Sequence, residues 1–198
     1  MTLSSVDLIH DNMLQRQSVG LLSEPAPNKQ QLERAFQAAL TAPDHHRLKP
    51  TSFVVIDEEK RQAFGNLLSH AMADFDGIDP TQVERVRSHP LRAPLLVLAL
   101  TTLTDHPKVP HYEQILSTGA AVQNFLLSLQ SQGFSTIWRT GAVVESSTLK
   151  KALGLQERDY ISGIIYIGTA DKALQQRTDH NVDGHISAWQ SDADLEAK

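Results

Sequence analysis

The sequence contains no cysteine, and aromatic residues make up only 6% of its 198 residues. The lack of cysteine excludes disulfide bridges, thiolate nucleophiles and cysteine-ligated metal or iron–sulfur sites. An excess of positive charge is also missing, because 18 Lys and Arg residues against 23 Asp and Glu residues give a net charge of −5. This balance argues against a surface for nucleic acid or anionic lipid, which would need a basic stripe.

Long apolar runs and the best-known catalytic motifs are absent as well. The longest apolar run, around residues 95–100, is far too short to span a bilayer. The first residues are polar where a signal peptide would be apolar, so we expect a cytoplasmic protein. The chain has no GxGxxG, GxxxxGK[ST], GxSxG or HExxH motif. An enzyme built from this chain therefore needs a cofactor to supply its difficult chemistry.

The residues that are present predict one α+β domain over residues 1–198. Apolar periodicity and breaker residues predict helices at 5–16, 28–42, 58–75, 111–132 and 147–153, a short helix that begins at residue 80, and strands at 52–56, 95–101, 134–139 and 160–167. Helices outnumber strands, and the two do not alternate as they do in a Rossmann fold. The helix at 111–132 is apolar around nearly its whole circumference, which predicts burial in a large core or in a subunit interface. The polar segment 169–198 cannot fold alone and must lie on its own domain or a neighbour, or stay disordered.

Two segments have the residue types of a ligand site. Arg16, Gln17 and Ser18 end the first helix, and an arginine beside two hydrogen-bonding side chains can hold a phosphate or a polar ring. The alternative is a solvated helix end. The second segment is 133–141, where a buried strand ends in an indole, a guanidinium, a hydroxyl and a glycine. Strand ends often bind ligands, although a structural tryptophan with a surface arginine is equally compatible with this pattern.

Histidines clustered with an aspartate suggest a metal site at Asp44, His45 and His46. Adjacent residues seldom bind one ion together, however, and no suitably spaced partner occurs in the chain. We therefore expect no metal. A loop that hydrogen-bonds a ligand, or a plain surface loop, explains these residues better, and a histidine-dependent metal hydrolase is the least favoured function.

The order and spacing of several short motifs resemble those of the bacterial nitroreductase family, the FMN-dependent NAD(P)H oxidoreductases. The matching pieces run from about Val6 to Thr169 and comprise Arg16-Gln17-Ser18, Glu24-Pro25-Ala26-Pro27, Ala42-Pro43-Asp44-His45, Arg92-Ala93-Pro94-Leu95, Lys108-Val109-Pro110, Gly133-Phe134, Ile137-Trp138-Arg139-Thr140-Gly141, Gly163 and Tyr166-Ile167-Gly168-Thr169. The resemblance implies an α/β/α sandwich with a mainly antiparallel sheet. It also implies an intertwined homodimer with FMN at the interface, in which segment 169–198 is an arm on the partner subunit.

The resemblance also implies which residues bind the cofactors. Arg16, Gln17, Ser18, Trp138, Arg139 and Thr140 would bind FMN from one subunit, and Thr41 and His45 would reach it from the other. The nicotinamide nucleotide, NADH or NADPH, would contact Ser128, Leu129, Gln130, Ser131, Gln132 and Gly133. No side chain is expected to act as a nucleophile or as an obligatory acid.

The implied reaction carries electrons from NAD(P)H through FMN to an electron-poor acceptor such as a nitroaromatic or a quinone, by ping-pong kinetics. A flavin-binding dimer that serves as a carrier or redox sensor is the alternative. The chain departs from the family where Lys49-Pro50-Thr51 replaces a Gln-Pro-Trp-like run, with Arg47 two places earlier. This change adds cations and favours an anionic substrate. Gln17 likewise stands where many relatives have a second arginine.

Overall fold

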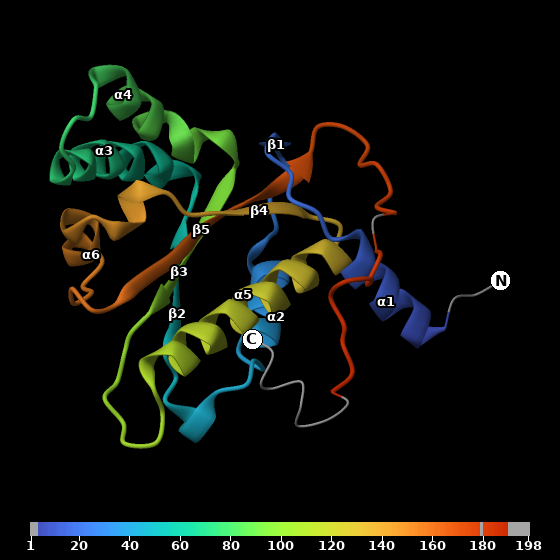
Figure 1. The fold of residues 1–198 in the computed structure, drawn as a ribbon. Coiled ribbons are helices and arrows are strands. Elements are labelled where there is room, and N and C mark those ends of the chain that lie inside the picture. Colours follow the sequence, from blue (N-terminus) through green and yellow to red (C-terminus); the bar gives the residue numbers. More distant parts are fainter. Residues whose placement is uncertain (1–3, 179, 190–198) are drawn as a thin grey trace.

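The computed structural model describes residues 4–178 and 180–189, which fold as one antiparallel sheet between two helical layers (Figure 1). The helices are α1 (Ser5–Gln15), α2 (Lys29–Ala39), α3 (Arg61–Ala71), α4 (Pro80–Ser88), α5 (His111–Ser131) and α6 (Ser147–Ala152). The strands are β1 (Leu22–Ser23), β2 (Thr51–Ile56), β3 (Leu95–Thr101), β4 (Ser135–Arg139) and β5 (Tyr160–Ala170). Short 3-10 helices are η1 (His45–Arg47), η2 (Glu58–Lys60), η3 (Met72–Asp74), η4 (His89–Arg92) and η5 (Ala142–Glu145).

The sheet is built around β5, which pairs with β3, β4 and β1, while β2 adds to the outer side of β3. Every residue of β3 is buried, as its continuous apolar run predicts. One face of the sheet packs on α3, α4 and α6, and the other packs on α2 and α5 (Figure 1). The predicted α+β sandwich with an antiparallel sheet is therefore confirmed.

Local sequence signals fix several element ends. Asn28 caps α2 and exchanges hydrogen bonds with Gln31, a capping box that needs only these two residue types three positions apart. Asp79 caps α4 and Pro80 occupies its first turn, where the missing N–H costs nothing. The predicted helix at 58–75 is instead three pieces, η2, α3 and η3, because Asp57 caps a separate 3-10 turn before α3 begins.

Helix α5, predicted to be buried in a large core or in a subunit interface, is buried on only one side within the single subunit. Its inner face is buried, with Phe125 and Leu129 wholly inaccessible, and this face packs against α2 and the sheet. On the other side Tyr112 is 60% exposed and Leu116 is 66% exposed. A single subunit therefore leaves an apolar side of α5 in solvent. The core of the subunit covers only the inner face of this helix, and the predicted subunit interface on the other side stays a prediction.

Candidate functional site

The segment after α1 lies along the first half of β4. Ser18 forms a parallel bridge with Thr136, and the Val19 amide donates to the Thr136 carbonyl over 3.0 Å. Arg16 and Gln17, both half-buried, precede this bridge. Strand β4 thus holds the predicted Arg16–Gln17–Ser18 group at the end where Ser135 and Thr136 lie.

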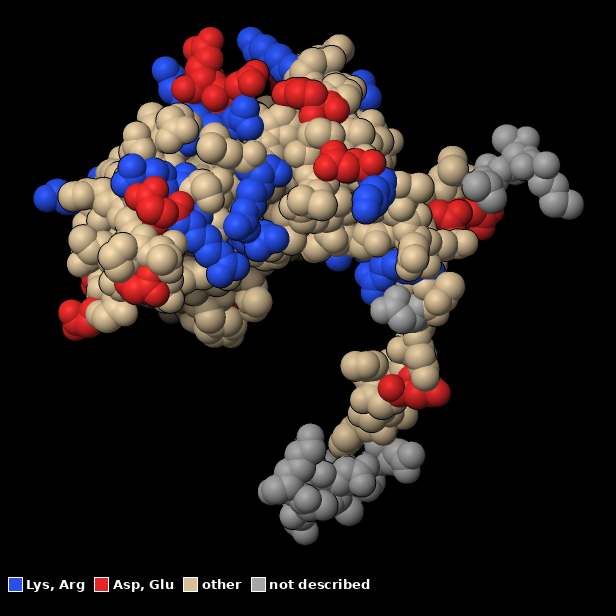
Figure 2. Space-filling model, turned by 90° about the horizontal axis from the view of Figure 1, so that it is seen from above, with Lys and Arg blue, Asp and Glu red and all other residues tan. Residues whose placement is uncertain are grey.

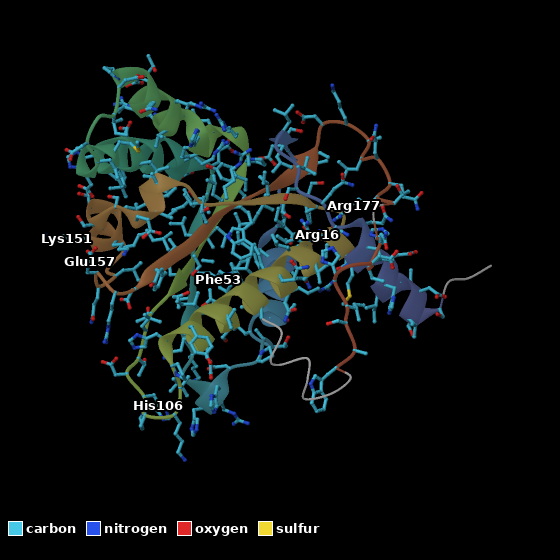
Figure 3. All side chains as sticks on the ribbon, in the orientation of Figure 1. Arg16, Phe53, His106, Lys151, Glu157 and Arg177 are labelled. Atoms are coloured by element: carbon cyan, nitrogen blue, oxygen red, sulfur yellow. The ribbon has the colours of Figure 1, made fainter. Side chains whose placement is uncertain are left out.

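The polar segment after β5 returns to this same end of β4. The Gln17 side-chain amide donates to the Gln175 carbonyl over 2.9 Å, and Arg177 Nη1 donates to the Arg16 carbonyl over 3.0 Å. Figure 3 shows Arg16 and Arg177 side by side next to α1. Residues 174–176, together with Gln15, Gln17 and Gln130, line a hollow of about 340 Å³ there. Two guanidinium-bearing residues therefore meet at this place, and the sequence gives no local signal that would have singled out Arg177.

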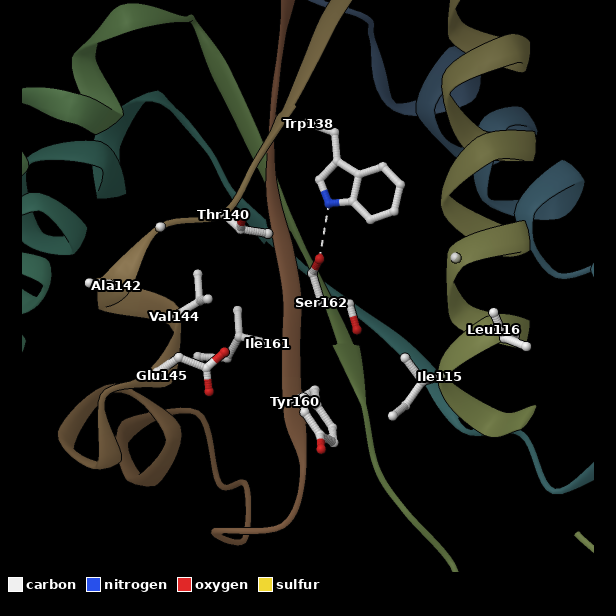
Figure 4. Close-up of a pocket in the computed structure, with 12 residues that line it drawn as sticks. Ile115, Leu116, Trp138, Thr140, Ala142, Val144, Glu145, Tyr160, Ile161 and Ser162 are labelled. Carbon is white, nitrogen blue, oxygen red and sulfur yellow. Dashed lines mark hydrogen bonds between the residues drawn. The ribbon is translucent and has the colours of Figure 1, made fainter. Parts of the chain in front are cut away.

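A cavity of about 630 Å³ lies at the opposite end of β4 (Figure 4). It has the size of an ordinary small-molecule site. The residues around it come from α5, from β4 and the turn into η5, and from the start of β5, and they are Ile115, Leu116, Gly119, Trp138, Thr140, Gly141, Ala142, Val144, Glu145, Tyr160, Ile161 and Ser162. Most of the other lining residues are apolar, and their sequence pattern marks them only as core. Sequence reasoning therefore found Trp138, Thr140 and Gly141 and missed the rest.

Trp138 is held in the cavity wall by β5. Its indole Nε1 donates to the Ser162 carbonyl over 2.9 Å, and 38% of the residue is exposed. The indole crosses β5 where Gly163 has no side chain, and a Cβ at that position would collide with Nε1 and Cδ1 of the ring. The absence of a side chain at residue 163 therefore fixes where the tryptophan lies.

Arg139 points away from this cavity, because successive side chains of a strand lie on opposite faces of the sheet. Its guanidinium carbon lies 6.0 Å from the centre of the Tyr166 ring, and its Nη2 lies 3.5 Å from where a Cβ of Gly20 would be. Tyr166 belongs to the core on the α3 side of the sheet. The structure thus separates two neighbouring residues that the resemblance assigns to one ligand, since the Arg139 side chain does not line the cavity that Trp138 lines.

Thr41 and His45, the residues expected to reach FMN from the partner, lie far along the chain from Arg16 and on the α5 side of the fold. The Thr41 hydroxyl donates to the Ala38 carbonyl over 2.7 Å and accepts a longer contact from Asn124 of α5. His45 Nδ1 lies 2.7 Å from Glu113 Oε2 at the start of α5. Neither residue lines the cavity at Trp138 in its own subunit, and their assignment to the partner's FMN stays a prediction.

The loop that carries His45 has an unusual backbone. His46, Arg47 and Lys49 adopt φ angles of 57°, 53° and 52°, which non-glycine residues seldom do. The imidazole of His46 lies between those of His45 and His106, with ring centres 4.8 and 4.6 Å apart. Among the described residues no group of three or more His, Asp or Glu side chains is arranged to hold a metal ion.

Residues 128–133, expected to contact the nicotinamide nucleotide, form the last turn of α5 and its end. Leu129 is wholly buried, so its side chain is not available to a ligand. The side-chain amide of Gln130 donates to the Asn12 carbonyl, and that of Gln132 donates to the Gln31 carbonyl over 3.1 Å. Ser128, Ser131 and Gly133 remain accessible, and the assignment of this run stays a prediction.

None of the described helices is both long enough and apolar enough to cross a membrane. Charged groups of the cavity are few, since Glu145 is the one ionisable carboxylate that lines it. The arrangement can therefore hold a flat, largely apolar group between α5 and β4, with polar and cationic groups along the strand toward Arg16.

The sequence of this chain matches a known protein family and a curated relative from that family. A sequence model described as the Nitroreductase family matches residues 13–169. The chain is 37% identical over 170 residues to the Escherichia coli K12 protein named "Putative NAD(P)H nitroreductase YdjA", covering 86% of this chain and 91% of that protein.

Solved structures share the fold. A nitroreductase-like family protein from Bacillus cereus superposes with a TM-score of 0.81 at 20% identity, over 96% of this chain and 99% of that one. A nitroreductase with bound FMN from Bacteroides fragilis superposes with a TM-score of 0.68 at 19% identity, over 92% and 98% of the two chains. The resemblance seen in the short motifs is confirmed: the chain belongs to the nitroreductase family.

Proposed function

We propose that the protein is an FMN-dependent oxidoreductase that takes electrons from NADH or NADPH and passes them to an electron-poor small molecule. The observation that carries the proposal is the course of β4, which joins the Arg16 segment at one end to the Trp138 cavity at the other. Thr140 follows β4 directly and lies four positions after Thr136, which corresponds to about 13 Å of extended chain. FMN has a matching shape, with a dianionic phosphate at one end and a flat ring system at the other.

The residues present fit this cofactor. Arg16 can neutralise a phosphate through a charge-assisted fork, and Ser18 and Gln17 offer neutral donors beside it. Arg177, which is tied to the Arg16 carbonyl, brings a second guanidinium to the same end. At the far end the apolar wall of α5 and the indole of Trp138 can enclose a conjugated ring and exclude water from it.

The flavin would supply the electron-transfer chemistry, and the chain would bind, orient and shield the reactants. The main chain at Thr140 and Gly141 borders the cavity, so that its polar groups can hold the edge of the ring in one orientation. Glu145 lies at the rim and is exposed, so protons can be exchanged with solvent without a dedicated side-chain acid. Donor and acceptor would share the one cavity, which implies ping-pong kinetics.

A homodimer completes this proposal. Thr41 and His45 of one subunit do not line the cavity of their own chain. The resemblance to the nitroreductase family implies that they contact the FMN of the partner subunit. The acceptor class is a nitroaromatic or a quinone. The cations of the loop at residues 47–49 would favour an acceptor that carries an acidic group.

The first test is the visible absorption spectrum of the purified protein, followed by anaerobic addition of NADH and of NADPH. We expect the two-peaked flavin spectrum and its bleaching by at least one nucleotide, with re-oxidation by a nitroaromatic or quinone. A protein that is colourless and takes up no added FMN would contradict the proposal. Bleaching without turnover of any acceptor would instead indicate a flavin carrier or redox sensor.

Arg16→Ala tests the phosphate end directly. The loss of one charge-assisted bond should weaken FMN binding by about 1.5–3 kcal/mol, which fluorescence titration of the apoprotein measures. Lys151→Ala is the control, because this lysine lies on α6 at the far side of the molecule (Figure 3). Equal FMN affinity in the two variants would remove Arg16 from the site.

A further inference from the structure

A row of hydrogen-bonded hydroxyl groups crosses the interior of the fold beside the cavity. Ser162 Oγ lies 2.6 Å from Thr101 Oγ1, and Thr101 donates to Thr118 Oγ1 over 2.8 Å. Thr118 Oγ1 in turn lies 2.9 Å from Thr51 Oγ1. The four side chains come from β5, β3, α5 and β2, so this row, the hydroxyl chain, exists only where these elements meet.

The two ends of the hydroxyl chain open on different spaces. Ser162 lines the cavity where Trp138 contacts β5 (Figure 4). At the other end Thr51 lines a separate hollow of about 320 Å³ between the end of α2 and α5, the Thr51 hollow. The two residues between these ends, Thr101 and Thr118, are wholly buried. The hydroxyl chain therefore joins two accessible spaces through residues that solvent does not reach.

A β-bulge directs Ser162 into the hydroxyl chain. The register of β5 against β3 shifts at residues 99 and 100, which leaves Ser162 opposite no residue of β3. Ile161 and Ile164 both pack in the core on the α3 side of the sheet. The Ser162 hydroxyl between them instead meets the Thr101 hydroxyl, which bonds to α5. Bulges often re-aim a side chain beside a functional site.

The fold does not require polar groups along this row. Strand β3 is apolar up to Thr101, and valine has nearly the shape of threonine, so an apolar row would avoid the cost of burying hydroxyl groups. Charged side chains lie on the surface, as Figure 2 shows for one face, and none among the described residues bonds to these hydroxyls. The hydroxyl chain is therefore neutral, and each member can both donate and accept.

We propose that the hydroxyl chain is a proton path from the Thr51 hollow to Ser162, and that Ser162 passes the proton to the ligand reduced in the cavity. This step rests on the proposed function. A quinone takes up two electrons and two protons, of which a hydride ion supplies both electrons and one proton. The second proton must come from solvent. The open rim at Glu145 is another route for it, and a ligand that fills the cavity obstructs that route.

The transfer breaks and forms only O–H bonds. Ser162 gives its proton to the oxygen of the reduced ligand and takes one from Thr101. Thr101 takes one from Thr118, and Thr118 takes one from Thr51. Thr51 takes its proton from water in the hollow, where buffer neutralises the hydroxide. No atom changes its oxidation state. Each hydroxyl then donates toward the hollow, as Thr101 does toward Thr118 in the structure, and rotation about the C–O bonds resets the path.

Thr118→Val interrupts the hydroxyl chain at its middle and nearly keeps the shape of the side chain. With NADH and a quinone we expect kcat to fall about tenfold to a hundredfold, which is the range of a lost proton transfer that solvent partly replaces. The KM for the quinone should not change. The solvent isotope effect of D2O on kcat should rise, because proton delivery becomes rate-limiting. Thr118→Ser, which restores the hydroxyl, should recover most of kcat.

Thr101→Val interrupts the same path at another link. A path broken twice conducts no less than a path broken once, so Thr101→Val with Thr118→Val should have the kcat of the single variants, whereas independent structural damage would multiply. Ser69→Ala is the control, since it removes a buried hydroxyl of α3 that donates to the Asn66 carbonyl. Unchanged kcat and isotope effect in Thr118→Val, or an equal fall of kcat in Ser69→Ala, would overturn the proposal.

Exchange of the Thr118 hydroxyl proton with water, followed by NMR, tests the path without flavin or turnover. Thr51→Val combined with Ser162→Ala removes the hydroxyls at both ends. This variant should slow the exchange about tenfold or more, to the rate at which the fold opens locally. Exchange as fast as in the unsubstituted protein would overturn the path. Slowed exchange in a protein that takes up no FMN would support the path and contradict the proposed function alone.

Discussion

At the scale of single residues, the strongest electrostatic perturbation lies at His89 and not in the cavity. A base whose pKa is depressed by folding favours the folded state only while it stays neutral. His89 has a pKa of about 4 in the folded chain against 6.5 for the free side chain. Between these values the unfolded chain binds a proton at this position that the folded chain does not.

The free energy of unfolding should therefore fall as the pH is lowered from 6.5 toward 4, by about 1 kcal/mol per pH unit from this residue. His89→Gln should make the fall shallower, which denaturant titrations at several pH values measure. His70→Gln on α3 is the control, since that histidine is exposed. A pH dependence that is the same in both variants would mean that another group is responsible.

Gly163 governs the cavity through the space that it leaves. Gly163→Ala would place a methyl group against the indole of Trp138 and displace its hydrogen bond to Ser162. We expect a loss of about 1–3 kcal/mol in stability from this overpacking. In a Trp189→Phe background, where Trp138 is the remaining tryptophan, its fluorescence should shift. An unchanged emission spectrum would show that the indole is not held at this contact.

At the scale of elements, the sequence predicted what is decided locally. The capping box of α2 and the proline of α4 need only neighbours three or four residues away, and both are present. The direction of the Arg139 side chain depends on how β4 is registered against β5. This register has no signature within one segment, so sequence reasoning assigned Arg139 and Trp138 to the same ligand site.

Helix α5 contains a glycine, Gly119, that borders the cavity. Small residues in a row, as at Gly119, Ala120 and Ala121, are typical of close helix packing. Ala121 is buried as expected, but a Cβ at Gly119 would meet no described atom within 4 Å, and this glycine lines the cavity. The missing side chain at residue 119 therefore leaves space in the cavity and does not serve a packed helix pair within the subunit.

Gly119→Ala should separate stability from ligand binding. A mid-helix glycine costs about 0.5–1 kcal/mol relative to alanine, so the melting temperature of the apoprotein should rise. The added methyl group enters the cavity, so FMN affinity should fall at the same time. Ser131→Ala, near the end of the same helix and away from the cavity lining, is the control for changes in helix propensity. Unchanged FMN affinity would mean that the ring does not reach this part of α5.

At the scale of the whole molecule, one subunit leaves too much apolar surface in solvent. Helix α1 has no buried residue, and Val6, Leu8, Ile9 and Met13 are each more than half exposed. An isolated helix of this length is marginal in water without a surface to cover its apolar side. On α5, Tyr112 and Leu116 add to this exposed apolar area. These exposed apolar side chains are compatible with the predicted homodimer, which would cover them.

The segment after Thr169 has contacts within its own subunit as well. Residues 169 and 170 pair with β1, and Gln175 and Arg177 bond to Gln17 and Arg16. Trp189, which is 71% exposed, ends the described part of this segment. Residues 190–198 lie outside the described residues, and the predicted packing of the arm on a partner subunit stays a prediction.

Dimerisation should be separable from folding by a charge placed on the exposed side of α5. Leu116→Asp puts a carboxylate on that surface, and burying an unpaired charge in an interface is costly. We expect the variant to sediment as a monomer and to keep its far-UV spectrum. Sedimentation is the readout that decides, because Leu116 also lines the cavity and a carboxylate there would itself weaken FMN binding. Leu21→Asp, a similarly exposed leucine before β1, should remain dimeric. A Leu116→Asp protein that stays dimeric and retains its flavin would place the interface elsewhere. Ile9→Asp on α1 would then test whether the other part of this apolar surface joins two subunits.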